Sequence, residues 1–344
     1  MKSRKKYYDA IMGNHVDSFR NLFERRWIEY IDNFPTAHRE AKQLRIGNRL
    51  RPCMVCWGYA LSTDAVEEMN FEEIIDLAIG IELIHKGSII IDDYIDDDSA
   101  RRGEVTFHKQ YSPNEAIMFL LFLLGKAVEK LSKFVNSDRV AHLICAMSES
   151  ALRELQLTSG SFFDVGEIDR IVKGETVALI KDSLLFGYEL RNQSVPEMNM
   201  ILENVATKCA YSFQLLNDLE PFTAINQNLQ NKHNHNFDFE KNRKNLIIAR
   251  LYQICSSEDK EFIRSHISDC ALIDVLLSLI GKYHIEDIVF KEVEKSKMEM
   301  REELNGLAIV MDNTECLNDF LYFINNTIDI CYLRVERTDE CGGF

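Results

Sequence analysis

Proline and glycine are scarce in this chain of 344 residues, which has 5 and 15 of them. Both residues interrupt helices, whereas long stretches of the chain place apolar residues three and four positions apart. The sequence therefore predicts an all-α protein. A convincing strand pattern, an internal repeat and a Ser/Gly-rich linker are all lacking. Their absence favours one helical domain, residues 1–344, over two domains.

A run long enough to cross a bilayer is also lacking. The longest apolar run, IMFLLFLLG from Ile117, is interpreted as a buried helix, and no transmembrane segment is expected. The amino end has no apolar signal segment, and the nine cysteines are scattered and odd in number, which favours a reducing, cytoplasmic location. Cys53 and Cys56 form the only CxxC and are interpreted as core residues.

Positive charge is in short supply, because 40 Lys and Arg face 55 Asp and Glu. The resulting net charge of −15 disfavours nucleic acid or an anionic membrane as a general partner. Basic residues are therefore interpreted one at a time.

The apolar periodicity predicts a series of helices, several of them apolar on all sides and so expected inside a large bundle. The expected ranges are 15–32, 36–61, 71–97, 113–133, 138–160, 167–191, 197–222, 242–254, 257–268, 270–281, 284–306 and 313–335. Residues 1–40 are expected to form a helical extension. The polar, Asn-rich residues 226–241 are either a solvated loop or a mobile lid that brings Lys232 and Lys241 over a bound anion.

A cluster of carboxylates follows the apolar run that ends at Ile91. It comprises Asp92, Asp93, Asp96, Asp97 and Asp98. Their mutual repulsion requires a divalent cation or arginine nearby. Oxygen ligands of this kind suit Mg²⁺, which completes its shell with water and substrate phosphate, and Arg101 and Arg102 add fixed charge for the same phosphate. The alternative is a solvated acidic helix end.

A second polar patch interrupts an apolar helix at Gln214, Asn217 and Asp218. Buried polar groups need partners, and a second metal would satisfy an asparagine and an aspartate together. The alternative is that Asn217 caps the helix break forced by Pro221.

Taken together, these segments resemble one family. They are GNRLRP from Gly47, ELIHKGSIIIDDYIDDDSARRG from Glu82, GETVAL from Gly174, FQLLNDLEPF from Phe213, and the later NK and DFEKNRKN. Their order and content are similar to those of the trans-isoprenyl diphosphate synthases, or polyprenyl synthetases. The resemblance implies a homodimer of helical bundles, each around a central active-site cavity (the isoprenoid synthase type I fold), in which three Mg²⁺ ions hold an allylic prenyl diphosphate.

The resemblance also implies roles for individual residues. The magnesium ligands would be Asp92, Asp93, Asp96, Asn217 and Asp218, with Glu220 a weaker candidate. The catalytic set would be the first three of these with Arg101. The substrate contacts would be Arg101, Lys232, Lys241 and Arg243 for the allylic diphosphate, Arg51, His85 and Arg102 for isopentenyl diphosphate, and Thr176 and Gln214. The pocket would be lined by Gly87, Ser88, Phe119, Phe122, Phe186, Tyr211 and Phe213. The aromatic residues are alternatively ordinary core, and Gly87 alternatively allows close helix packing.

The chain departs from the family pattern where a second diphosphate would bind. Asn48 and Glu175 stand where the family has lysines, and neither can replace the attraction of a lysine for diphosphate. The departures predict ionisation without efficient elongation. The leading interpretation is therefore a Mg²⁺-dependent terpene synthase that ionises farnesyl or geranylgeranyl diphosphate and lets the cation cyclise or react with water. The alternatives are a chain-elongating isoprenyl diphosphate synthase and a regulatory subunit of such a synthase.

Overall fold

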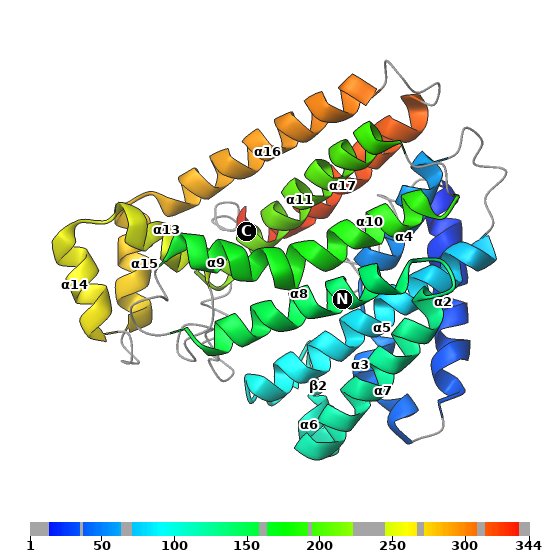
Figure 1. The fold of residues 1–344 in the computed structure, drawn as a ribbon. Helices are drawn as coiled ribbons and strands as arrows, with labels where there is room; N and C mark the ends of the chain where they lie inside the picture. Colours follow the sequence, from blue (N-terminus) through cyan, green and yellow to red (C-terminus); the bar gives the residue numbers. More distant parts are fainter. Residues whose placement is uncertain are drawn as a thin grey trace, which may run out of the picture. The chain divides into compact units, whose positions relative to one another are not determined.

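The computed structural model describes residues 14–34, 37–62, 71–157, 164–191, 195–222, 245–266, 272–307 and 314–336 (Figure 1). In chain order the elements are α2 (Asn14–Asp32), the 3₁₀ turn η1 (Ala37–Glu40), α3 (Lys42–Arg45), α4 (Leu50–Leu61), α5 (Phe71–Ile95), β1 (Ala100–Arg101), β2 (Glu104–Val105), α6 (Phe107–Gln110), α7 (Pro113–Leu131), α8 (Ser137–Leu155), α9 (Val165–Val172), the π turn η4 (Lys173–Val177), α10 (Ala178–Glu189), α11 (Pro196–Leu219), the 3₁₀ turn η5 (Glu220–Phe222), α13 (Leu246–Ile254), α14 (Ser257–His266), α15 (Leu272–Lys282), α16 (Ile285–Leu307) and α17 (Thr314–Glu336). The all-α prediction is confirmed.

The observed elements differ from the expected helices in several places. The single helix expected over 36–61 is broken, because Arg49 adopts a left-handed conformation (φ 56°) at the start of α4. The helix expected over 167–191 contains the π turn η4. A two-stranded hairpin, β1 with β2, was not expected and is described below.

Two compact units emerge from the packing of the chain. Unit 1 comprises residues 1–145, 179–203 and 307–320, and unit 2 comprises residues 146–178, 204–306 and 321–344. The single-domain prediction, the 1–40 extension and the 226–241 lid remain predictions, and the lid, with Lys232, Lys241 and Arg243, lies outside the described residues. None of the helices within the described ranges is both long and apolar enough to cross a membrane.

Unit 1 is built around α5. This helix packs against α4 on one side and α7 on another, which is why it is apolar on nearly all sides. α2 completes the core with Phe19, Phe23, Trp27 and Ile31, which repeat every four residues and are fully buried. These contacts hold α5, whose carboxyl end carries the acidic motif.

Unit 2 contains the short helices α13, α14 and α15, of which α15 contacts both α13 and α14, and α9 packs on α13 (Figure 1). The buried face of α11 in this unit includes Val205, Cys209 and Leu216. The polar residues Gln214 and Asp218 lie on the same helix.

Candidate active site

The first acidic motif forms a left-handed helix end. Asp97 has a φ of 53°, and its amide donates to the Tyr94 carbonyl at 3.1 Å, while the Asp98 amide donates to the Asp93 carbonyl at 2.9 Å. These two bonds define a Schellman motif, which closes α5 within one turn. The carboxylates therefore gather at the negative end of the helix dipole, where a cation is favoured and additional negative charge is not.

The β1–β2 hairpin returns the basic pair to this helix end. Ala100 pairs with Val105 and Arg101 with Glu104, and the two turn residues, Arg102 and Gly103, both have positive φ (55° and 82°). Two positive φ values are typical of a type I′ turn, for which arginine is a strained choice. The hairpin brings Arg101 back to Asp93 at the end of α5.

Arg101 pairs with Asp93. The Arg101 Nε donates to Asp93 Oδ1, and the Asp93 side chain is fully buried. Burial raises the pKa of Asp93 to about 6, although the neighbouring guanidinium opposes the shift. A buried carboxyl with a raised pKa gains most from a cation placed beside it.

The same carboxylate fits a divalent ion. Asp93 Oδ2 is buried and has no hydrogen-bond partner among the described residues, and Asp92 and Asp96 lie within the same motif. A hard cation would satisfy that oxygen. Within the described ranges, no three His, Cys, Asp or Glu side chains are arranged to hold a metal by themselves. This is compatible with Mg²⁺, which commonly takes one or two carboxylates and completes its shell with water and substrate oxygens.

A second group of predicted residues converges in unit 1. Arg51 Nη1 lies 3.0 Å from His85 Nε2, and Arg102 is close enough to lower the pKa of both side chains. Burial is the larger cause: it lowers the pKa of Arg51 to about 10 and that of His85 well below its ordinary value. At neutral pH the group carries the charges of two arginines beside a neutral imidazole.

Two buried hydrogen-bond donors in this group have no acceptor among the described residues. Arg51 Nε and His85 Nδ1 have no hydrogen-bond partner among the described residues. Unsatisfied buried donors are costly, and an anion would satisfy both. The structure thus brings Arg51, His85 and Arg102 together, and their role as an anion-binding group remains a prediction.

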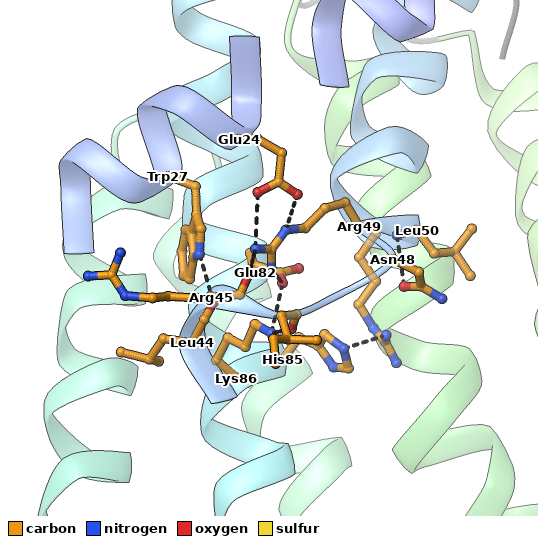
Figure 2. Close-up of polar contacts among 12 residues, drawn as sticks. Glu24, Trp27, Leu44, Arg45, Asn48, Arg49, Leu50, Glu82, His85 and Lys86 are labelled. Carbon is orange, nitrogen blue, oxygen red and sulfur yellow. Dashed lines mark hydrogen bonds and ion pairs between the residues drawn. The ribbon is translucent and has the colours of Figure 1, made fainter. Parts of the chain in front are cut away.

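Four buried or half-buried charges lie next to this group (Figure 2). Glu24, Arg49, Glu82 and Lys86 form an ion-pair cluster, called here the Arg49 cluster, in which Arg49 bonds Glu24 at 2.8 Å and Glu82 at 2.6 Å. Sequence reasoning did not assign these residues a role. Glu82 and Lys86, which are two charges one turn apart in an apolar helix, were the available signal.

The predicted residues of unit 2 form a hydrogen-bonded chain. Thr176 Oγ1 lies 2.9 Å from Gln214 Oε1, and Gln214 Nε2 donates to Asp218 Oδ1 at 2.6 Å. Asp218 Oδ2 accepts the Leu246 amide at 2.8 Å, at the start of α13. Asp218 therefore joins α11 to α13, and its role as a metal ligand with Asn217 remains a prediction.

Gly87 allows close packing of α5 on α7. A Cβ at this position would lie 2.9 Å from Leu120 Cδ1, so the space beside the glycine is filled by Leu120. This contact supports the packing alternative for Gly87, and its place in a substrate pocket remains a prediction. Ser88, one position on, is half-buried, and its hydroxyl donates to the His85 carbonyl at 3.0 Å.

Two of the predicted pocket aromatics belong to a ring cluster. Phe119 stacks on Phe107 with centroids 5.0 Å apart and on Phe122 at 5.8 Å, and Phe34 meets Phe122 edge-on at 5.1 Å. These rings lie on α6, on α7 and just beyond α2. Their place in a substrate pocket remains a prediction.

The other predicted aromatics have separate surroundings. Phe186 is buried, and the Arg139 guanidinium lies 4.9 Å from its ring centroid. The Tyr211 hydroxyl bonds Asp169 and accepts from Arg250 at 2.9 Å, and burial raises the pKa of Tyr211 far above its ordinary value. Phe213 is half-buried on α11. Tyr211 thus has a polar role that its aromatic character alone did not indicate.

Comparisons with known proteins support the family. The polyprenyl synthetase family profile matches residues 39–274. A short chain isoprenyl diphosphate synthase from Methanocaldococcus jannaschii is 23% identical over 272 residues, which cover 76% of each protein.

Solved structures share the fold. A geranylgeranyl pyrophosphate synthetase from Pyrococcus horikoshii superposes with a TM-score of 0.73 at 21% identity, covering 97% of this chain and 99% of that one. A polyprenyl synthase from Caulobacter crescentus, crystallised with calcium and isoprenyl diphosphate, gives 0.73 at 18% identity, covering 93% and 98%.

These comparisons bear on the predicted reaction. The relatives are named as diphosphate synthases, which favours the elongation alternative over the expected terpene synthase, for which they offer no specific support. The expected terpene synthase rested on the absence of lysines at Asn48 and Glu175, whereas Arg51, His85 and Arg102 match the family pattern. The chain belongs to the polyprenyl synthetase family and is an enzyme that acts on prenyl diphosphates.

Proposed function

We propose that this enzyme elongates prenyl chains by condensing an allylic diphosphate with isopentenyl diphosphate. The observation that carries the proposal is the group formed by Arg51, His85 and Arg102, which are two cations and a neutral imidazole. In this group Arg51 Nε and His85 Nδ1 are buried donors without a partner in the described part of the chain. An enzyme that only ionises one diphosphate has no need for a second anion-binding group. Relatives named as short chain isoprenyl and geranylgeranyl diphosphate synthases support the same reaction.

In the proposed reaction the allylic carbon–oxygen bond breaks, and diphosphate leaves with the electron pair. The double bond of isopentenyl diphosphate attacks the allylic carbon, a carbon–carbon bond forms, and loss of a proton restores a double bond. Arg101 would stabilise the departing diphosphate, while Arg51 and Arg102 would hold the second diphosphate. His85 stays neutral, so it can donate a hydrogen bond without adding charge.

We propose Mg²⁺ as the cofactor, held by Asp92, Asp93 and Asp96. When bound, it would supply charge stabilisation for the departing diphosphate. The buried Asp93 Oδ2 without a described partner supports the assignment, as does the calcium with which the Caulobacter crescentus polyprenyl synthase was crystallised.

The test supplies allylic diphosphates of different chain length with Mg²⁺, with and without isopentenyl diphosphate. Longer prenyl diphosphates formed only when isopentenyl diphosphate is present support elongation. Hydrocarbons or alcohols formed from the allylic substrate alone would overturn it in favour of a terpene synthase. Activity that requires a second, different subunit would overturn it in favour of a regulatory role.

We also propose that the chain acts as a homodimer through α7. Ile117, Met118, Leu121 and Val128 lie on one side of this helix and are exposed, Met118 by 63% and Leu121 by 55%. Exposed apolar residues on one helix face are typical of a buried interface. Light scattering should give twice the chain mass, and Leu121→Lys should lower it; a monomeric wild type would contradict the proposal.

A cytoplasmic location is likewise our proposal. No disulfide joins the cysteines within the described ranges to one another, and most of these cysteines are buried. Free thiols are the rule in reducing compartments.

A further inference from the structure

Two charged residues are buried one turn apart in α5 for no reason that the proposed reaction supplies. Glu82 is 1% exposed and Lys86 is 2% exposed. Buried charges are costly unless they are paired and hydrogen-bonded. Neither side chain is a predicted substrate contact, so their partners indicate what they do.

Lys86 binds the carboxyl end of α3. Its Nζ donates to the Gln43 carbonyl at 2.9 Å and to the Ile46 carbonyl at 2.5 Å, and lies 3.6 Å from Glu82 Oε1. Lysine at a helix end satisfies carbonyls that have no partner within the helix. Here it fixes the point at which the chain leaves α3 and turns toward Arg49.

Arg49 is held in an unusual conformation by the same cluster (Figure 2). Its φ is 56°, and its guanidinium bonds Glu24, Glu82 and the Arg45 carbonyl. A left-handed arginine persists only where its surroundings impose it. A Cβ on Gly47 would lie 2.8 Å from Arg49 Nη1 and 3.3 Å from Lys86 Nζ, so the turn is packed directly on both cations.

The cluster therefore determines where α4 begins. Arg49 is the N-cap of α4, and Arg51 follows two positions later, with Nη1 3.0 Å from His85. His85 lies on α5 beside Lys86. A shift of residues 46–49 would move Arg51 relative to His85 and open the anion-binding group.

We propose that Lys86 and Glu82 are positioning residues, which hold residues 46–49 so that Arg51 meets the second diphosphate. The inference rests on the proposed elongation reaction. Neither residue touches the substrate, and both act through Arg49 and the α3 carbonyls.

The position of Lys86 makes its role sensitive to pH. The charged groups that face it are Glu82 from α5, Arg49 from the start of α4, Arg102 from the hairpin and Glu24 from α2. Burial lowers the pKa of Lys86 to about 8. Above that pH the amine loses its charge, and its bonds to the α3 carbonyls lose their charge assistance. The other two ionisable groups do not change charge around this pH. His85 stays neutral because its pKa is well below its ordinary value, and Arg51 stays charged because its pKa is about 10.

The experiment compares wild type with Lys86→Met, Glu82→Gln and the control Lys130→Met. The control removes a lysine of α7 that bonds Asp76 of α5 at 2.6 Å. Lys86→Met should raise the KM for isopentenyl diphosphate about tenfold, leaving kcat and the allylic KM within about twofold. The wild-type KM for isopentenyl diphosphate should rise severalfold from about pH 7 to about pH 9, whereas Lys86→Met should show no such rise. Glu82→Gln should move the rise to lower pH, because Glu82 raises the pKa of Lys86.

Lys130→Met should behave as wild type. A wild-type KM that is flat over this pH range, or a Lys86→Met profile that keeps the rise, would overturn the inference. If Lys86→Met fails to fold, calorimetric titration of wild type and Glu82→Gln with isopentenyl diphosphate alone gives the same decision. That titration also distinguishes a failure of the positioning role from a failure of the proposed function. If isopentenyl diphosphate binds more weakly as pH rises but the enzyme never elongates a prenyl chain, the proposed function is refuted and the positioning role is retained.

Discussion

Nη1 of Arg51 lies 3.0 Å from Nε2 of His85. Since a guanidinium can only donate, Nε2 must be the acceptor, and the imidazole proton must sit on Nδ1. Burial keeps the pKa of His85 low, so no second proton is present at neutral pH. Arg51 therefore selects the tautomer that leaves a buried N–H donor free for an anion.

Replacing Arg51 with methionine should weaken the binding of isopentenyl diphosphate. The change removes a charged donor and releases the His85 tautomer, so we expect the KM to rise about tenfold to a hundredfold, with a small change in the allylic KM. Arg45→Met is the matched control, because Arg45 is an arginine of the preceding helix that pairs with Asp32 at 2.5 Å. Equal losses in both variants would show that the effect is not specific to the anion-binding group.

The acidic motif provides a second comparison. Asp93 is fully buried against Arg101, whereas the Asp97 side chain is 80% exposed and pairs with Lys109. Asp93→Asn should lower turnover on the order of a hundredfold or more, because it removes charge from the proposed metal site. Asp97→Asn should stay within about twofold, since asparagine tolerates the left-handed backbone. The measurement is the initial rate as a function of Mg²⁺ concentration. Full activity in Asp93→Asn would refute the metal assignment.

The helices could be predicted from the sequence because the spacing of the apolar residues indicates which side of a helix is buried. α5 is the clearest case: its apolar run extends to the acidic motif, and the structure ends the helix within that motif at Ile95. The break at Arg49 was not accessible, because arginine carries no local signal for a left-handed conformation. Its cause is the Arg49 cluster, which joins α2, α4 and α5 and exists only after the chain has folded.

The candidate site could likewise be predicted from the sequence only in part. Arg51, His85 and Arg102 were named from motif positions, and the structure brings them together. The close packing at Gly87 depends on Leu120, a residue on another helix, so the sequence left two alternatives open. Asp218 was assigned by its place in a motif, but its bond to the Leu246 amide depends on how α11 meets α13.

The two lost lysines offer a third prediction. Asn48 accepts the Leu50 amide at 3.3 Å and so contributes a weak bond near the start of α4, while Glu175 lies in the π turn η4. Asn48→Lys and Glu175→Lys each add positive charge where the family carries it, and we expect the KM for isopentenyl diphosphate to fall by about threefold to tenfold. Kinetics of the single and double variants measure this. Unchanged constants would mean that the remaining anion-binding group already suffices.

The last prediction concerns stability and follows from the buried Lys86. Its pKa is lowered to about 8 from an ordinary 10.5, so between these values the unfolded chain binds more protons at this lysine than the folded chain. The free energy of unfolding that this residue contributes must therefore rise with pH between about 8 and 10.5. Below about pH 8 the lysine is charged in the folded protein, and the full cost of burying that charge is present. From about pH 7 to about pH 9.5, the free energy of unfolding of wild type should gain about 2 kcal/mol over that of Lys86→Met.

Urea unfolding at a series of pH values measures this difference, with Lys130→Met expected to follow wild type. The same deprotonation is expected to weaken the binding of isopentenyl diphosphate, so stability and affinity should move in opposite directions as pH rises. A lysine with a purely structural role would stabilise the protein and preserve binding together. Stability that rises with pH while the affinity for isopentenyl diphosphate stays constant would therefore show that the charge on Lys86 does not position Arg51.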